Sequence, residues 1–170
     1  LAHCEYRSGS FIAAQDHLQE CAHVLEKVGK VVESEVVNQN LAVVYAETGR
    51  LKQASKLLRS SYYSPRSGPK TDYNKVTFSI NWAYIQSLRG RFEEARRSLR
   101  RCEPLVDKFQ SDKGQYFAKL GLTEMLDGNL EAADKALKCA SAVVSEVAPG
   151  SSLEAETATL RGELCIRSRE

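Results

Sequence analysis

The chain has 170 residues, of which 42% are hydrophobic and 27% charged, proportions that are typical of a folded globular protein and exclude a largely disordered one. A formal net charge of +2 at pH 7 gives no general attraction to nucleic acid. No stretch approaches the roughly 18 consecutive apolar residues that a membrane-spanning helix requires.

The pattern of apolar residues predicts helices along the whole chain. In chain order they cover 1–8, 10–28, 31–48, 51–62, 72–89, 92–110, 113–127, 130–147 and 152–168. Two prolines and a glycine interrupt the pattern at 63–71, and a proline and a glycine interrupt it at 148–151. Ser151 or Ser152 can then cap the last helix. The sequence therefore predicts an all-α protein.

Four segments align with one another without gaps: LAHCEYRSGSFIAAQDHL from Leu1, LAVVYAETGRLKQASKLL from Leu41, WAYIQSLRGRFEEARRSL from Trp82 and LGLTEMLDGNLEAADKAL from Leu120. Each begins with a large apolar residue followed by a small one. A glycine, an alanine, a leucine and a second small residue then follow at fixed intervals. They are the glycines Gly9, Gly49, Gly90 and Gly128, the alanines Ala14, Ala54, Ala95 and Ala133, the leucines Leu18, Leu58, Leu99 and Leu137, and the small residues Cys21, Ser61, Cys102 and Ala140.

Each of these positions has a physical role in a pair of helices. Glycine suits a helix C-terminus, where it adopts a left-handed conformation at little cost. The alanine allows two helices to cross closely, and the leucine one turn later fills the space beyond. Two helices joined by a turn of about three residues pack antiparallel. The segments therefore predict four helix-turn-helix repeats.

This string of positions resembles the tetratricopeptide (TPR) repeat. The resemblance implies a right-handed superhelix, a single solenoid domain over 1–170. Its repeats lie at about 1–29, 31–64, 72–111 and 113–148, with a C-terminal helix over 152–168. That helix either caps the solenoid with a polar outer face or is the first helix of a fifth repeat.

The repeats are longer than usual. Gly9 to Gly49 is 40 residues, Gly49 to Gly90 is 41 and Gly90 to Gly128 is 38, against about 34 in the common repeat. Stretched repeats of this kind are similar to those of kinesin light chains and MalT-like regulators. Glu5, Gln86 and Glu124 stand where the family prefers an aromatic residue, and only Tyr45 keeps it.

In TPR arrays the first helix of each repeat lines a concave groove, so the register names the residues that face it. They are Val36, Gln39, Asn40, Val43 and Glu47 in the second repeat, Thr77, Ile80, Asn81, Tyr84 and Leu88 in the third, Gln115, Lys119, Leu122 and Leu126 in the fourth, and His3, Tyr6 and Arg7 in the first. In peptide-binding members, asparagines at the place of Asn40 and Asn81 bond to the peptide backbone, because an amide both donates and accepts. Lys119 holds the same place and could receive a carboxylate. The alternative is that these polar side chains are merely solvated.

Hsp70/Hsp90 co-chaperones hold a C-terminal carboxylate with a set of charged and amide side chains. Here Gln39, Val43, Thr77 and Gln115 stand where several of those charges are expected. Binding of a chaperone tail is therefore disfavoured.

Other groupings of reactive or charged residues have simpler interpretations. Arg96, Arg97, Arg100 and Arg101 fall on a second helix, where Glu93 pairs with Arg97 at i,i+4, so we expect a solvated outer face and no nucleic-acid interface. His17, Cys21 and His23 are the densest metal-like group, but Cys21 falls on a packing position, and we expect no metal.

The five cysteines, Cys4, Cys21, Cys102, Cys139 and Cys165, are odd in number and widely spaced. We interpret them as reduced thiols packed as small apolar side chains, which indicates the reducing environment of the cytoplasm.

No phosphate-binding loop, nucleophile elbow or HExxH motif occurs, so we expect neither enzyme activity nor a cofactor. The first hypothesis is a non-enzymatic module that binds a peptide or helix of another protein in its groove, with self-association as a further option. The alternative is a structural or sensor segment of a larger MalT-like regulator. A nucleic-acid adaptor is a weaker third option. Because the chain begins at Leu1, it is expected to be a fragment of a longer protein.

Overall fold

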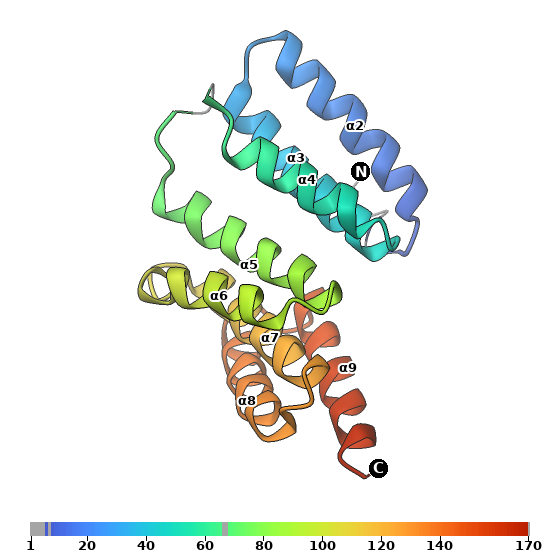
Figure 1. Ribbon diagram of the computed structural model, residues 1–170, viewed down its shortest axis with the longest axis vertical. Helices are drawn as coiled ribbons and strands as arrows, with labels where there is room; N and C mark the ends of the chain where they lie inside the picture. Colours follow the sequence, from blue (N-terminus) through green and yellow to red (C-terminus); the bar gives the residue numbers. More distant parts are fainter. Residues whose placement is uncertain (1–5, 7, 66–67, 170) are drawn as a thin grey trace. The chain divides into compact units, whose positions relative to one another are not determined.

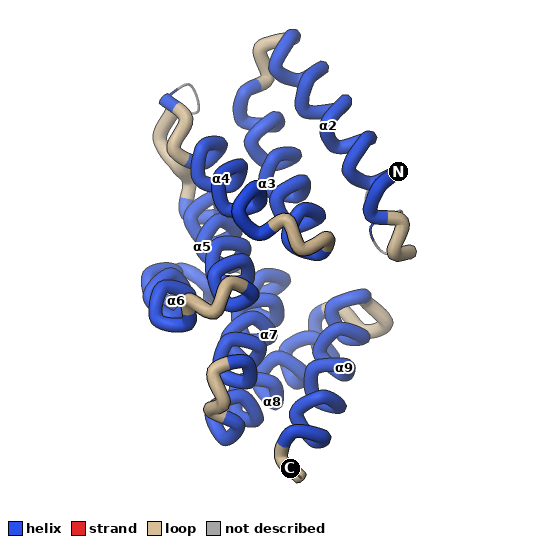
Figure 2. The backbone as a smooth tube through the Cα atoms, turned by 45° about the vertical axis from the view of Figure 1, so that its right-hand side comes forward, coloured by secondary structure: helices blue, strands red, loops and turns tan. Residues whose placement is uncertain are grey.

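The structure is a computed structural model that describes residue 6 and residues 8–65 and 68–169. Within these residues the protein is all-α, with eight helices and no strand (Figures 1 and 2). The helices are α2 (Phe11–Lys27), α3 (Val31–Glu47), α4 (Leu51–Tyr62), α5 (Asp72–Leu88), α6 (Phe92–Val106), α7 (Gln110–Leu126), α8 (Leu130–Val147) and α9 (Ser152–Arg167). The helix predicted over 1–8 lies mostly outside the described residues.

Most predicted helix boundaries are confirmed to within one residue, and one turn is not. The turn between α6 and α7 was expected after 110, whereas α6 ends at Val106 and α7 begins at Gln110. No glycine marks this turn in the sequence. It is set instead by Phe109, whose amide donates to Val106 O at 2.9 Å and whose ring packs against the core of α5 and α6.

The chain divides into two compact units, residues 1–71 and residues 72–170, which we call unit 1 and unit 2. In unit 1, α3 packs against both α2 and α4. In unit 2, α7 packs against α5, α6 and α8, and α9 packs against α7 and α8. The helix α9 therefore packs against both helices of the α7–α8 pair, just as α7 packs against both helices of the α5–α6 pair.

The repeat glycines end their helices as predicted. Gly49 has a φ of 76°, Gly49 N donates to Ala46 O at 3.0 Å, and Arg50 N donates to Tyr45 O at 2.8 Å. This pair of bonds is the Schellman motif, which satisfies carbonyls that the helix leaves unpaired. The same pair of bonds closes the helices before Gly90 and Gly128.

The repeat alanines and leucines form the helix crossings. Ala14, Ala54, Ala95 and Ala133 are all 0% exposed, so each lies where a longer side chain has no room. The small member of the large–small pair is equally constrained in the fourth repeat. A Cβ added at Gly121 would lie 2.6 Å from Cδ2 of Leu137, far inside van der Waals contact. The predicted close approach of the two helices is confirmed there.

The last helix begins as predicted. The hydroxyl of Ser151 accepts from Glu154 N at 3.3 Å, and the Glu154 carboxylate accepts from Gly150 N at 2.6 Å. One orphan N–H group at the start of α9, that of Glu154, and the N–H group of Gly150 just before the N-cap are therefore both satisfied.

The prediction for the cysteines is only partly right. Cys102 is buried in the core of α5 and α6, and burial raises its pKa to about 11. Cys21, Cys139 and Cys165 are exposed, so they do not pack as small apolar side chains, and Cys4 lies outside the described residues. Across the described part of the chain, no helix is long and apolar enough to cross a bilayer.

Candidate partner-binding faces

One face of α3 in unit 1 carries most of the predicted second-repeat residues. Val36 is 43% exposed, Asn40 and Glu47 are exposed and Val43 is half-buried. Their spacing of 4, 3 and 4 residues places them on one stripe of a helix. Gln39 lies off this stripe and is buried.

Sequence reasoning missed one member of this stripe. Val32 lies one turn before Val36 and is 51% exposed. Its position at i−4 from a predicted groove residue was the signal that could have found it. At the other end, the Tyr6 hydroxyl donates to the Glu47 carboxylate at 3.1 Å. We call Val32, Val36, Asn40, Val43 and Glu47 the α3 face.

In unit 2 the predicted residues are more deeply placed. Thr77, Asn81 and Leu88 on α5 are half-buried and Tyr84 is buried. The Thr77 hydroxyl donates to Tyr73 O of its own helix at 3.0 Å. On α7, Gln115 is exposed and Leu122 is buried. This part of the predicted site therefore offers partners less surface than the α3 face does.

Lys119 is engaged within the chain. Its ammonium group lies 4.3 Å from the ring centroid of Tyr84 on α5 and donates to the carboxylate of Glu156 on α9. The carboxylate that the sequence suggested for Lys119 is thus present, but it comes from the protein itself. The arrangement joins α5, α7 and α9 through one cation–π contact and one ion pair.

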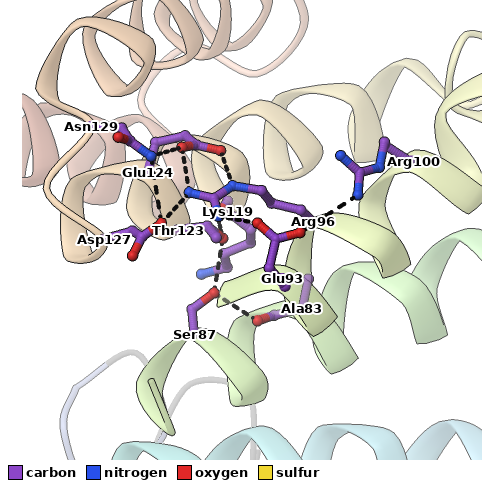
Figure 3. A network of polar contacts seen from close by, with 10 residues as sticks. All are labelled: Ala83, Ser87, Glu93, Arg96, Arg100, Lys119, Thr123, Glu124, Asp127 and Asn129. Carbon is purple, nitrogen blue, oxygen red and sulfur yellow. Dashed lines mark hydrogen bonds and ion pairs between the residues drawn. The ribbon is translucent and has the colours of Figure 1, made fainter. Parts of the chain in front are cut away.

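Arg96 is the most highly connected side chain in unit 2, as Figure 3 shows. Its guanidinium group holds Glu124 in a bidentate pair, with both N–O distances at 2.7 Å. It also donates to Asp127 at 2.5 Å and to Glu93 at 2.8 Å. The Arg96 bonds hold the pKa of Glu124 below its ordinary value, and these bonds raise the pKa of Arg96.

This network corrects two predictions. Arg96 was expected on a solvated face, yet its side chain is only 14% exposed, because it forms an ion pair with the poorly exposed Glu124 at the end of α7. The carboxylate of Glu93 pairs with Arg96 and not with Arg97. Arg97, Arg100 and Arg101 are exposed, as predicted.

The same network continues from α7 to α5. The hydroxyls of Ser87 and Thr123 lie 2.8 Å apart, and each also lies within hydrogen-bond distance of a carbonyl of its own helix (Figure 3). One of the two hydroxyls therefore donates to the other, which in turn donates to its own helix. Asn129 donates to Glu124 at 2.9 Å. We call Arg96 with Glu124 and Asp127 the ionic clasp. It joins the second helix of one repeat to the first helix of the next.

Unit 1 has a counterpart that is mostly neutral. Gln15 lies six residues after Gly9, as Arg96 lies six residues after Gly90. Gln15 accepts from Arg50 at 2.5 Å, and the Arg50 guanidinium lies 4.4 Å from the ring centroid of Tyr45. The Tyr45 hydroxyl in turn accepts from Gln19 at 2.9 Å. Both groups of contacts, the ionic clasp and its counterpart around Arg50, pack one repeat against the next.

The metal-like group of the sequence lies on α2. His17 is half-buried, and Cys21 and His23 are exposed. A search of the described residues finds no cluster of three or more His, Cys, Asp or Glu side chains that could hold a metal ion.

No model of a known protein family matches the chain, and no curated protein matches it significantly. The TPR resemblance therefore rests on the repeat positions and on the helix packing described above.

Proposed function

We propose that the chain is a TPR-type protein–protein interaction module, without enzyme activity, that holds a peptide or helix of another protein against its first helices. The right-handed solenoid with a concave groove is part of this proposal. The α3 face is the observation that carries it. Its two exposed valines lie one turn apart and are followed, one turn later, by the amide of Asn40.

The chemistry of this face favours an extended segment. Valine side chains gain from being removed from water, whereas a bound backbone must keep its N–H and C=O groups paired. Asn40 and Asn81 each offer a donor and an acceptor for that purpose. A peptide can therefore bury apolar side chains on the valines of the α3 face while its backbone bonds to the amide of Asn40.

The charges favour a neutral or apolar segment. Among the predicted groove residues of the second, third and fourth repeats, Lys119 is the one cation, and Glu156 already compensates it. An acidic tail bound in unit 2 would have to displace this internal carboxylate, and an acidic tail bound to the α3 face would meet Glu47. The proposed partner is therefore a largely uncharged segment, and the proposed compartment, supported by the free thiols, is the cytoplasm.

The test begins with site-specific crosslinking. A photoreactive amino acid replaces Val36 on the α3 face or, as the control, Gln53, which is exposed on α4. A partner that binds the α3 face crosslinks from position 36 and not from position 53. The crosslinked segment is then synthesised for quantitative binding.

Binding of that segment is compared between the wild type and the double variant Asn40→Ala, Asn81→Ala. Two lost hydrogen bonds of about 1 kcal/mol each predict binding weaker by roughly tenfold or more. Asn38→Ala is the matched control, because Asn38 lies on the same helix away from the stripe and donates to Ser34 at 3.5 Å. Unchanged binding in the double variant rejects the proposal, as does loss of binding in Arg97→Glu, Arg101→Glu.

One observation favours the second candidate, a structural or sensor segment of a larger MalT-like regulator. The helix α9 packs on α7 and α8 as the first helix of a further repeat would. A nucleotide-binding or DNA-binding domain in the flanking sequence of the longer protein would support this candidate.

A further inference from the structure

The first half of α3, residues 31–39, buries polar side chains and exposes apolar ones. Ser34, Glu35 and Gln39 are buried, whereas Val32 and Val36 are exposed. The second half of the helix buries the apolar residues Leu41, Ala42, Val44 and Ala46. Because stabilisation by burial grows with the apolar area that is removed from water, the hydrophobic effect holds the second half of α3 much more firmly than the first.

The equivalent positions of the later repeats are occupied by apolar or small residues. Glu35 and Gln39 lie 14 and 10 residues before their repeat glycine, Gly49. The same places hold Val76 and Ile80 in the third repeat and Gly114 and Ala118 in the fourth. Val76 and Ile80 belong to the hydrophobic core that α5 and α6 share. Unit 1 therefore buries a carboxylate at a position where unit 2 has a core side chain.

Lys70 compensates the buried carboxylate of Glu35. It lies in the connection between α4 and α5, and its ammonium group donates to Oε2 of Glu35 at 2.6 Å. The same group lies 5.2 Å from the ring centroid of Tyr62 at the end of α4. The side chains of Lys70 and Glu35 are 15% and 3% exposed, so both charges are largely removed from water. The other carboxylate oxygen, Oε1, is buried and has no hydrogen-bond partner among the described residues.

We call Lys70 with Glu35 the Lys70 latch. A buried ion pair gains mutual attraction but loses the hydration of both charges, so its net contribution to stability is often close to zero or unfavourable. A carboxylate oxygen without a partner makes the balance less favourable still. Loss of the cation alone, in contrast, leaves a buried charge uncompensated and is strongly destabilising. The closed latch and a state in which both charges are hydrated therefore lie close in free energy.

We propose that the Lys70 latch is a conformational switch in unit 1. In the closed state Lys70 compensates Glu35, and the first half of α3 keeps its packing. In the open state both charges are hydrated, and residues 68–71 and the first half of α3 lose their packing together. The polar contact of Ser34 that opposes opening is a long one, since its hydroxyl donates to Glu26 of α2 at 3.4 Å.

The switch has a consequence for the α3 face. Val32 and Val36 lie on the half of α3 that opens, and the closed state presents them one turn apart on a helix. A partner that binds this face therefore shifts the equilibrium toward the closed state. This consequence rests on the proposed function. The switch itself is measured on the chain alone, so its failure is distinguishable from failure of the proposed function.

Hydrogen exchange of the full chain, followed by mass spectrometry, measures the opening. Lys70→Met leaves Glu35 buried without its cation, so the amides of residues 36–39 should exchange faster by about tenfold or more. Glu35→Leu with Lys70→Met replaces both charges by apolar side chains of similar size. In this double variant the same amides should exchange about tenfold more slowly than in the wild type.

Lys30→Met is the matched control. The ammonium group of Lys30 lies 3.9 Å from the carboxylate of Glu33, also in the first half of α3, but both side chains are exposed. An exposed ion pair contributes little to stability. Residues 36–39 of Lys30→Met should therefore exchange as they do in the wild type.

Three results would overturn the inference. If the double variant exchanges as fast as Lys70→Met, the pair is a fixed structural contact that apolar side chains do not replace. If Lys70→Met exchanges like the wild type, Lys70 does not hold α3 closed. Equal acceleration throughout α2, α3 and α4 would show a loss of stability of the whole unit and no local opening. If Lys70→Met does not fold, the double variant decides, since exchange no slower than in the wild type would reject the switch.

Discussion

Units 1 and 2 use the same repeat positions but fill them differently. The buried apolar residues of unit 1 are Ala14, Ala22, Leu41, Ala42, Val44, Ala46, Ala54 and Leu58, of which five are alanines. Unit 2 buries larger side chains, including Phe78, Ile80, Ile85, Tyr116 and Met125. Unit 1 exposes the aliphatic residues Ile12, Val24, Val28, Val32 and Val36, whereas unit 2 exposes Val147 and Ile166. A repeat can thus place its large apolar residues inside, where they stabilise the fold, or outside, where they are available to a partner.

The ionic clasp of unit 2 and its counterpart in unit 1 also fill equivalent positions with different side chains. The ionic clasp of unit 2 depends on charges, since Arg96 holds Glu124 and Asp127. Its counterpart in unit 1 joins Arg50 to a neutral amide and an aromatic ring. Equivalent positions therefore give a linkage that responds to acid in unit 2 and one that does not in unit 1.

The largest expected effect on stability comes from truncating the buried leucine at the same repeat position in each unit. Leu58→Ala and Leu99→Ala each remove a fully buried side chain, at a cost of about 3 kcal/mol. Unit 1 has fewer large side chains to retain its fold, so Leu58→Ala should abolish hydrogen-exchange protection in α3 and α4. Leu99→Ala should only reduce protection in α5 and α6. The reverse order would show that burial of large residues does not set the relative stability of the units.

The close approach of α7 and α8 is tested at Gly121. Ala42 holds the corresponding place in unit 1, so alanine is tolerated between α3 and α4. Gly121→Ala should cost about 2 kcal/mol, because the new methyl group overlaps Leu137. Gly162→Ala on α9 is the matched control and should stabilise by about 0.5–1 kcal/mol, since its site is open and alanine favours helix. Urea unfolding of the two variants measures both values.

The ionic clasp is tested by Arg96→Met, which keeps much of the side-chain volume and removes the charge. The buried carboxylate of Glu124 then loses its bidentate partner, and we expect a loss of about 2 kcal/mol in the free energy of unfolding. Arg97→Met, one residue along on the exposed side, should change stability by less than about 0.5 kcal/mol. Equal effects of the two variants would mean that the clasp contributes nothing specific.

The clasp should also weaken in acid. Because the pKa of folded Glu124 lies below its ordinary value of 4.5, the clasp stabilises the fold fully above that pH. Its contribution is lost as the pH falls through the folded pKa. The difference in stability between the wild type and Arg96→Met should therefore shrink as the pH is lowered from 7 to below 4.5. Thermal unfolding of both proteins across this range measures it, and a constant difference would contradict the assignment.

The sequence predicted what depends on local spacing. Gly49 and Ala54 act through their own turn and helix crossing, so a repeated interval was enough to identify them. Contacts between repeats were not predictable in this way. Arg96 meets Glu124 across 28 residues and Lys119 meets Glu156 across 37, so each pair depends on how neighbouring repeats pack.

The turn near Phe109 was misplaced for the same reason. A packed ring sets it, and no glycine or proline marks it in the sequence. Where a side chain's position is decided by the next repeat, the interval within one repeat carries no information about it.

One repeat position is occupied by cysteine in both units, Cys21 in unit 1 and Cys102 in unit 2. At this position we expect the smallest change in stability and the sharpest contrast between the units. Burial keeps the pKa of Cys102 near 11 and excludes reagents, whereas Cys21 is exposed on α2. A maleimide at pH 7 should label Cys21 rapidly and Cys102 only after unfolding, because the thiolate is the reactive form. Peptide mapping by mass spectrometry separates the two sites. Equal labelling rates of Cys21 and Cys102 in the folded protein would contradict the burial of Cys102.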